Sequence, residues 1–141
     1  FDEIGYNLKP LDLQASIGLK QIDKLPYLDA ARRKNHKRLS EIFLPYSKYF
    51  HLPVATENSD PCWFAFLMTI KEDAPFTRND IVSHLESSKI QTRSYGDLNK
   101  SFPIARLVTT NSFFLGTYAG LTEDKLNYIK QSVDRFFKEI K

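Results

Sequence analysis

The sequence predicts a small α+β domain in which a sheet of about three strands packs against helices. Apolar residues recur at helical spacing in several segments, and the three shorter apolar runs at 62–70, 90–95 and 112–118 have the composition of strands. The length of 141 residues suits one domain. Because so small a sheet needs cover to be stable, we expect the helices to pack on it. The sequence leaves strand order and direction open.

Capping residues and prolines set the expected helix boundaries. The helices are expected at 12–22, 26–44, 77–88, 103–108 and 122–140. Asp12 is a candidate N-cap, Pro26 suits a first helical position, and Thr77 with Asp80 resembles a capping box. The helix after Thr122 has the clearest apolar spacing, with acidic residues at its positive N-terminus.

The first helix is unusual because its apolar residues do not keep to one narrow stripe. Leu13, Ile17, Leu19 and Ile22 point in several directions. Gly18 inside a helix costs roughly 1 kcal/mol relative to alanine, and close approach of a neighbouring backbone is the usual compensation. We therefore expect this helix to be wedged between two partners, one of them outside this chain.

Composition excludes several classes of protein. The longest apolar run, Cys62–Met68, is far shorter than the roughly 20 residues of a membrane helix. The single cysteine rules out an internal disulfide, and His36, His51 and His84 lack the spacing of a metal site. We expect Cys62 to be a small core residue, His84 to lie at the surface, and the strand at 62–70 to be buried on both faces.

The basic run at 32–38 permits two interpretations. Arg32, Arg33, His36 and Lys37 have spacings near i, i+4 and could face one phosphate groove. Alternatively, the run is a solvated helix face, which we favour because the net charge of +3 is modest. No P-loop, GxGxxG or GxSxG motif occurs. Composition and spacing alone therefore stop at an α+β domain.

One segment of the sequence indicates a protein family, which composition does not. Residues 5–22 read GYNLKPLDLQASIGLKQI and closely resemble a signature of the DegT/DnrJ/EryC1/StrS family of pyridoxal-phosphate-dependent enzymes, which act on nucleotide-linked keto sugars. Further pieces of the resemblance are Arg33, 60–66, 89–93 and 111–121. They resemble the 4-keto-6-deoxyhexose 3-dehydratases more than the sugar aminotransferases, as do Leu8-Lys9 after Asn7 and the DPCWF sequence at 60–64.

The resemblance implies a fold-type-I architecture of which this chain is the C-terminal portion. Residues 1–24 would return from a large cofactor-binding domain, and residues 25–141 would form the small C-terminal domain. The catalytic residues, including the Schiff-base position that is lysine in aminotransferases and histidine in dehydratases, would lie upstream. The fragment alone is then expected to be inactive, with no catalytic residue of its own.

The resemblance also assigns site residues within this chain. Asn7 matches an asparagine that reaches the cofactor phosphate of a partner subunit, and Lys9 would add charge there. The alternative for Asn7 is a turn residue before Pro10. Arg93, Trp63 and Tyr6 are candidate substrate-binding residues, with a surface salt bridge as the alternative for Arg93 and a core position as the alternative for Trp63.

The implied cofactor is PLP or PMP, with an iron–sulfur cluster in the full-length enzyme left open. The implied substrate is a nucleotide-linked 4-keto-6-deoxy sugar, converted by a cytoplasmic homodimer with a shared active site in deoxysugar or lipopolysaccharide O-antigen biosynthesis. A nucleotide-sugar aminotransferase is the alternative within the family, and a basic nucleic-acid-binding module is the alternative outside it. The loop after Arg93 is shorter than the resemblance implies, so it is either truncated or lacks residues in this sequence.

Overall fold

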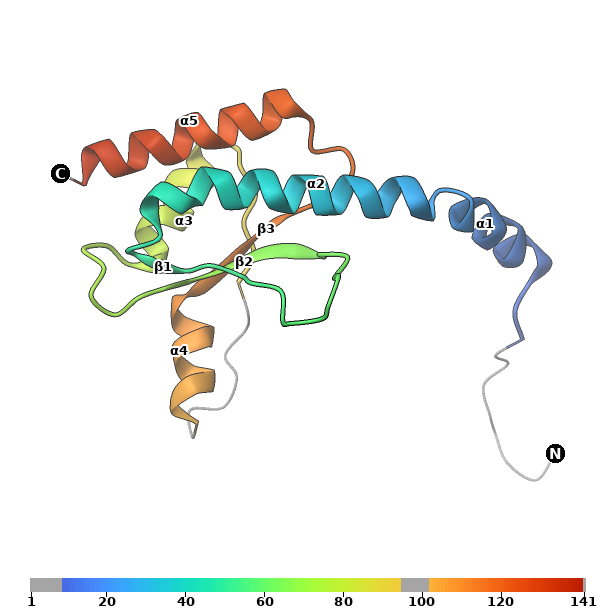
Figure 1. Ribbon diagram of the computed structural model, residues 1–141, viewed down its shortest axis with the longest axis horizontal. Coiled ribbons are helices and arrows are strands. Elements are labelled where there is room, and N and C mark those ends of the chain that lie inside the picture. The colour runs from blue at the N-terminus through green and yellow to red at the C-terminus, as the bar shows by residue number, and fades with distance from the viewer. Residues whose placement is uncertain (1–8, 95–101, 141) are drawn as a thin grey trace.

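The computed structural model describes residues 9–94 and 102–140 (Figure 1). The elements follow in the order α1 (Asp12–Ile22), α2 (Leu25–Phe43), the 3-10 turn η1 (Leu44–Tyr46), β1 (Phe50–His51), β2 (Ala65–Ile70), α3 (Arg78–Ser87), α4 (Pro103–Asn111), β3 (Ser112–Gly116) and α5 (Glu123–Glu139). This confirms the α+β class. The first helix has the predicted bounds, although Leu11 rather than Asp12 occupies its N-cap.

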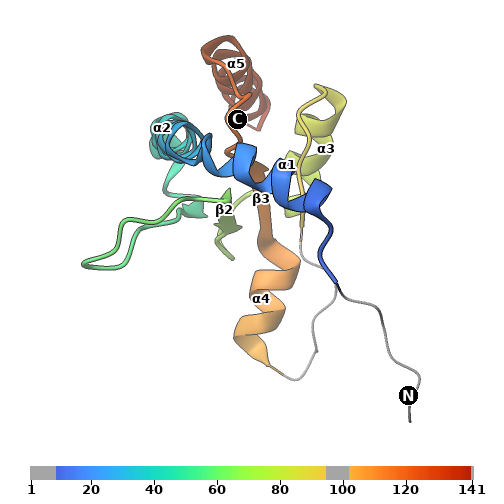
Figure 2. The same cartoon turned by 90° about the vertical axis from the view of Figure 1, so that its right-hand side faces the viewer.

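The sheet is antiparallel throughout, in the order β1-β2-β3. Strand β2 is central and pairs along most of its length with β3, with Leu67 opposite Phe114. Helices α2, α3 and α5 lie on one side of the sheet, and α4 projects from the other side (Figures 1 and 2). The strand direction, which the sequence leaves open, is therefore antiparallel. An antiparallel sheet can be covered by helices on one face.

The core lies between the sheet and the three covering helices. Aromatic rings dominate it: Phe43, Phe66 and Phe113 are fully buried, and the Phe43 and Phe66 rings lie 5.8 Å apart. Helix α5 contributes the apolar residues that its spacing predicted, namely Leu126, Ile129, Val133, Phe136 and Phe137. Helix α3 begins with the predicted capping box, in which the Thr77 amide donates to Asp80 Oδ2 at 2.7 Å.

Two strand predictions were wrong. The run at 62–70 is not buried on both faces: the strand begins at Ala65, and buried Phe66, Met68 and Ile70 alternate with half-buried residues. This alternation follows from helices covering only one face. The described part of the segment predicted at 90–95, residues 90–94, forms no strand and contributes one bridge, Arg93 to Phe114. The place of this predicted strand in the sheet is taken by β1, which is only two residues long and therefore shows no recognisable periodicity.

Helix α1 extends away from the body of the fold (Figure 1). None of its residues is buried, and Leu13, Leu19 and Ile22 are 60–71% exposed. A Cβ added at Gly18 would meet nothing within 4 Å. The predicted close contact at Gly18 is therefore not made by any of the described residues, and no packing partner for the helix is found among them.

Candidate functional site

A hollow of about 810 Å³ opens where the end of β3 meets the first turns of α5. Its walls come from five separate parts of the chain: α2, the segment before β2, the segment after α3, β3 with the turn that follows it, and α5. The side chains that carry its chemistry are Arg32, Phe64, Lys89, Arg93, Phe114, Tyr118, Asp124, Lys125 and Tyr128. The size suits a small organic ligand.

Backbone pairing positions Arg93 at this hollow. Its amide donates to the Phe114 carbonyl at 3.1 Å, and the Phe114 amide donates back at 2.8 Å. The neighbouring Thr92 is buried, and its hydroxyl donates to Glu86 Oε1 at 2.7 Å. Because side chains alternate along extended backbone, the inward Thr92 directs Arg93 outward, where it is exposed.

The opposite wall is built on the turn between β3 and α5. The Leu121 amide donates to the Tyr118 carbonyl at 3.0 Å, and the buried Asn35 amide group donates to the same carbonyl at 2.8 Å. A Cβ at Gly120 would approach the Tyr118 ring to 2.8 Å, so glycine leaves the room that this ring occupies beside the turn. The Lys125 ammonium donates to the Gly120 carbonyl at 2.9 Å.

Aromatic side chains form the floor. Phe64 is 74% exposed, and its ring lies 6.5 Å from that of Phe114. The Arg32 guanidinium lies over the Phe64 ring at 5.8 Å from its centre, and the Lys125 ammonium lies at the same distance from the centre of the Tyr118 ring. Both are cation–π arrangements, so the hollow combines exposed aromatic faces with positive charge.

The hollow is electropositive because its cations lack acidic partners. Within the described residues, Arg32, Lys89 and Arg93 form no salt bridge. Asp124 is the acidic residue that lines the hollow. Such a site favours an anion that also carries an apolar or aromatic part.

Three other cations of the basic run, Arg33, Lys34 and Arg38, are paired with carboxylates instead. Lys34 and Arg38 both pair with Glu123, at 3.0 and 3.2 Å, and their hydrogen bonds hold the pKa of Glu123 below its usual value. Arg33 pairs with Asp29 at 2.7 Å. The run is therefore not a single phosphate-binding face.

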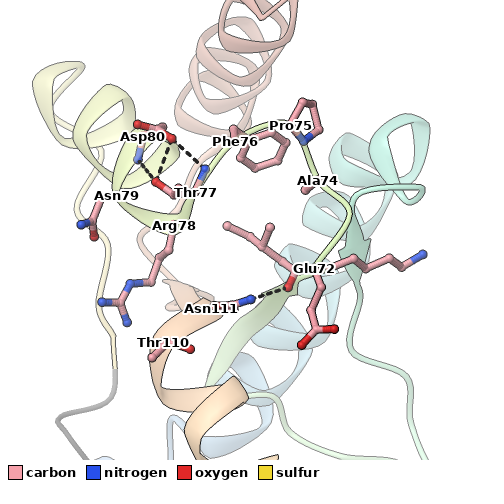
Figure 3. Close-up of a pocket in the computed structure, with 12 residues that line it drawn as sticks. Glu72, Ala74, Pro75, Phe76, Thr77, Arg78, Asn79, Asp80, Thr110 and Asn111 are labelled. Atoms are coloured by element: carbon pink, nitrogen blue, oxygen red, sulfur yellow. Dashed lines mark hydrogen bonds between the residues drawn. The ribbon is translucent and has the colours of Figure 1, made fainter.

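A second hollow, of about 700 Å³, lies beside the start of α3 (Figure 3). Several of its polar groups already have partners: Thr77 and Asp80 bond to each other, the Arg78 guanidinium donates to the Thr109 carbonyl, and the Asn111 amide group donates to the Ile70 carbonyl at 3.2 Å. The hollow beside Arg93 is therefore the better candidate for a ligand.

Comparison with known proteins assigns the chain. The profile of the DegT/DnrJ/EryC1/StrS aminotransferase family matches residues 1–134. The chain belongs to this family. It is 39% identical to dTDP-4-dehydro-2,6-dideoxy-D-glucose 3-dehydratase of Saccharopolyspora spinosa, over 96% of this chain and 32% of the relative. It is 32% identical to the lipopolysaccharide biosynthesis protein RfbH of Salmonella typhimurium, over 97% of this chain and 35% of the relative.

A solved structure gives the same assignment. The E. coli GDP-4-keto-6-deoxy-D-mannose-3-dehydratase with bound hydrated PLP superposes with a TM-score of 0.77 at 25% identity, over 91% of this chain and 36% of that one. The chain thus spans about a third of the length of the relatives that it matches. The predicted family and fold type are confirmed.

The described residues contain only part of the site that the DegT/DnrJ/EryC1/StrS resemblance implied. Arg93 lines the hollow. Trp63 does not, because its ring stacks on the buried His36 with centres 3.9 Å apart. Asn7 and Tyr6 lie outside the described residues. Lys9 is exposed, at the start of the described chain.

Two further predictions about single residues need correction. Cys62 is exposed rather than part of the core, because it precedes β2 instead of lying in it. Hydrogen bonding to Asp29, with some desolvation, raises the pKa of the Cys62 thiol, which opposes a nucleophilic role. His84 is half-buried rather than at the surface, with Nε2 at 2.9 Å from the Ser132 carbonyl.

The described residues fit a cofactor of this DegT/DnrJ/EryC1/StrS family only in part. Lys9 forms no salt bridge among them, so its ammonium is available to a phosphate, whose oxygens only accept hydrogen bonds. They contain no cluster of three His, Cys, Asp or Glu side chains that could hold a metal ion. No helix among them is long and apolar enough to cross a membrane.

Sequence reasoning missed most of the hollow. Lys125 and Tyr128 come from a segment that the sequence marks only as a helix start, and Lys89 and Tyr118 lie in stretches of the resemblance without having been singled out. Phe64 stood inside a motif that was quoted for the resemblance, but its exposure could not be read from an apolar run. The one usable signal was Arg93.

Proposed function

We propose that the whole protein is a PLP- or PMP-dependent 3-dehydratase that acts on a nucleotide-linked 4-keto-6-deoxy sugar in deoxysugar or lipopolysaccharide O-antigen biosynthesis. The observation that carries this proposal is the 39% identity to a dTDP-sugar 3-dehydratase over 96% of this chain. Two GDP-4-keto-6-deoxy-D-mannose 3-dehydratases, from Yersinia pseudotuberculosis and E. coli, match at 35% and 28% identity. RfbH supports the lipopolysaccharide context.

In this proposal residues 1–24 connect to a large cofactor-binding domain and residues 25–141 form the small domain. The core supports the division, because the buried apolar residues run from Leu39 to Phe137 and include none from α1. A helix that is apolar on several sides is stable when other structure covers it. We assign that cover to the large domain and to the second subunit of a cytoplasmic homodimer.

The chemistry divides between the two domains. The bound cofactor supplies an electron sink beside the sugar C4 ketone, which assists departure of the C3 hydroxyl. This chain's own residues bind and orient: Asn7 and Lys9 donate to the cofactor phosphate of the neighbouring subunit, and Arg93 holds the anionic part of the substrate. We assign Trp63 an indirect role, since its ring supports the segment that carries Phe64. Tyr6 is proposed to contact the sugar.

The test uses the full-length protein, loaded with PMP and incubated with a GDP- or dTDP-linked 4-keto-6-deoxy sugar. Mass spectrometry of the product is expected to show loss of the C3 oxygen. A product that gains an amino group at C4 instead would establish the aminotransferase alternative, which the 24% identity to a GDP-perosamine synthase supports more weakly. Histidine at the upstream Schiff-base position favours dehydration, and lysine favours transamination.

Two remaining alternatives are less well supported. A nucleic-acid-binding module would need the basic run free, whereas Arg33, Lys34 and Arg38 are ion-paired. Filter binding of RNA and DNA across a salt series tests it, with no salt-dependent affinity expected at micromolar protein. An iron–sulfur cluster is held by several cysteines, and this chain supplies one, Cys62, so a cluster would depend on cysteines elsewhere in the protein.

A further inference from the structure

We propose that the hollow beside Arg93 is the nucleotide subsite, with the Phe64 ring as the platform for the base and with Arg93 and Lys89 as the cations for the diphosphate. This inference rests on the proposed function, because it takes the substrate to be a nucleotide-linked sugar. It adds which residues of this domain hold which part of that substrate.

The aromatic platform is the first argument. Phe64 is 74% exposed although it lies directly before a strand whose inward side chains are fully buried. Its ring has two neighbours, the Phe114 ring at 6.5 Å between centres and the Arg32 guanidinium at 5.8 Å from its centre. An exposed ring with these neighbours offers a preformed surface. A nucleobase of any identity can stack on such a ring.

The unpaired cations are the second argument. Arg33, Lys34 and Arg38 each pair with a carboxylate, whereas Arg32, one residue away, turns to the hollow and forms no salt bridge among the described residues. Lys89 also lines the hollow without a salt bridge in that part of the chain. Several cations that line one hollow without a carboxylate partner suit a multiply charged anion such as a diphosphate.

Backbone geometry holds Lys89 in place. It has φ of 60°, in the left-handed region that non-glycine residues rarely occupy, at the end of α3. Its amide donates to the Glu86 carbonyl at 2.9 Å, which closes the helix end. From this turn the chain runs directly to the bridge at Arg93, so both cations lie on one short segment beside β3.

The size of the hollow is the third argument. About 810 Å³ lies within the range of pockets that hold small organic ligands and accommodates a base with a diphosphate. An anion without a ring would leave the Phe64 and Tyr118 faces uncovered, and a neutral aromatic would leave the cations unpaired. A nucleoside diphosphate satisfies both kinds of surface.

Calorimetric titration of the full-length, cofactor-loaded protein with GDP, dTDP and inorganic pyrophosphate tests the proposal. Phe64→Leu keeps the apolar volume but removes the ring, and is expected to weaken GDP and dTDP binding roughly 5- to 100-fold while pyrophosphate binding stays unchanged. Arg93→Gln is expected to weaken all three. Phe64→Tyr keeps a ring and should retain nucleotide affinity, which excludes misfolding as the cause.

Matched controls come from the same surface. Phe102→Leu is the control for Phe64→Leu, because Phe102 is 62% exposed and does not line the hollow. Lys37→Gln removes an exposed cation of the basic run. Equal nucleotide affinities for Phe64→Leu and Phe102→Leu would overturn the proposal. If nucleotide binding depends on Phe64 but the protein catalyses no dehydration, the proposed function alone is refuted. If the protein catalyses dehydration but Phe64→Leu leaves nucleotide affinity unchanged, this inference alone is refuted.

Discussion

The contact between Tyr46 and Asp134 joins η1, the turn after α2, to α5 and gives a sharp test of the packing. The Tyr46 hydroxyl donates to Asp134 Oδ1 at 2.7 Å, and the Tyr46 ring stacks on Phe137 with centres 4.0 Å apart. Burial and the neighbouring carboxylate raise the pKa of Tyr46 to about 12. Hydrogen bonds from Lys130 and Tyr46 outweigh the effect of burial and hold the pKa of Asp134 below its usual value.

Tyr46→Phe removes the hydroxyl and keeps the stacked ring. A hydrogen bond to a charged group contributes about 1.5–3 kcal/mol when fully buried. Asp134 is 31% exposed and also paired with Lys130, so we expect a loss of about 1–2 kcal/mol at pH 8. Tyr49→Phe is the matched control, because Tyr49 stacks on the same Phe137 ring and its hydroxyl has no hydrogen-bond partner among the described residues. It should change stability by less than about 0.5 kcal/mol.

The pH dependence follows from the sign of the shift. The folded pKa of Tyr46, about 12, lies above the ordinary value of 10, so its stabilising effect is complete below pH 10 and is lost as the pH rises toward 12. Urea unfolding at pH 8 and pH 11 should show the difference between wild type and Tyr46→Phe shrinking by about 1.4 kcal/mol at most. A difference that stays constant between the two pH values would refute the reasoning.

Three further substitutions test the core, the helix cap and the buried histidine. Phe66→Ala empties a fully buried site and should lower the free energy of unfolding by about 3–5 kcal/mol in urea denaturation. Thr77→Ala removes the side chain that caps α3 and should lower stability by about 1 kcal/mol, with amide exchange accelerated in the first turn of α3. Burial lowers the pKa of His36, so the unfolded chain takes up a proton more readily, and stability should fall as the pH drops below about 6.5. His36→Phe, which can still stack on Trp63, should abolish that part of the acid-induced loss; an unchanged pH profile would contradict it.

Local signals were sufficient for the helices. The capping box at Thr77, the proline at the start of α2 and the apolar spacing of α5 act within one or two turns, so the sequence predicts those helices to within a few residues. The sheet was harder, because strand identity depends on partners far away in the chain. Phe50 belongs to a strand because it pairs with Ile70, whereas Arg93 forms an isolated bridge with Phe114 among the described residues.

The site could be predicted only through resemblance. Arg93 was found because the resemblance gives its position a role, whereas Tyr118 and Lys125 have no such role and reach the hollow through a turn whose geometry depends on Asn35 from α2. That hydrogen bond joins residues 83 positions apart, and no periodicity encodes it. Cys62 was assigned to the core because an apolar run does not show where a strand begins.

Helical spacing explains how one basic run serves several purposes at once. Arg32 and His36 lie one turn apart on the same face of α2, and the chain before β2 meets them in order: Trp63 stacks on His36, and Phe64 receives Arg32 over its ring. Burial of His36 therefore fixes the register of this segment, and with it the position of Phe64. The aromatic and cationic surfaces of the hollow are thus tied to the core, so a ligand meets groups that are already positioned and loses less binding energy in ordering them.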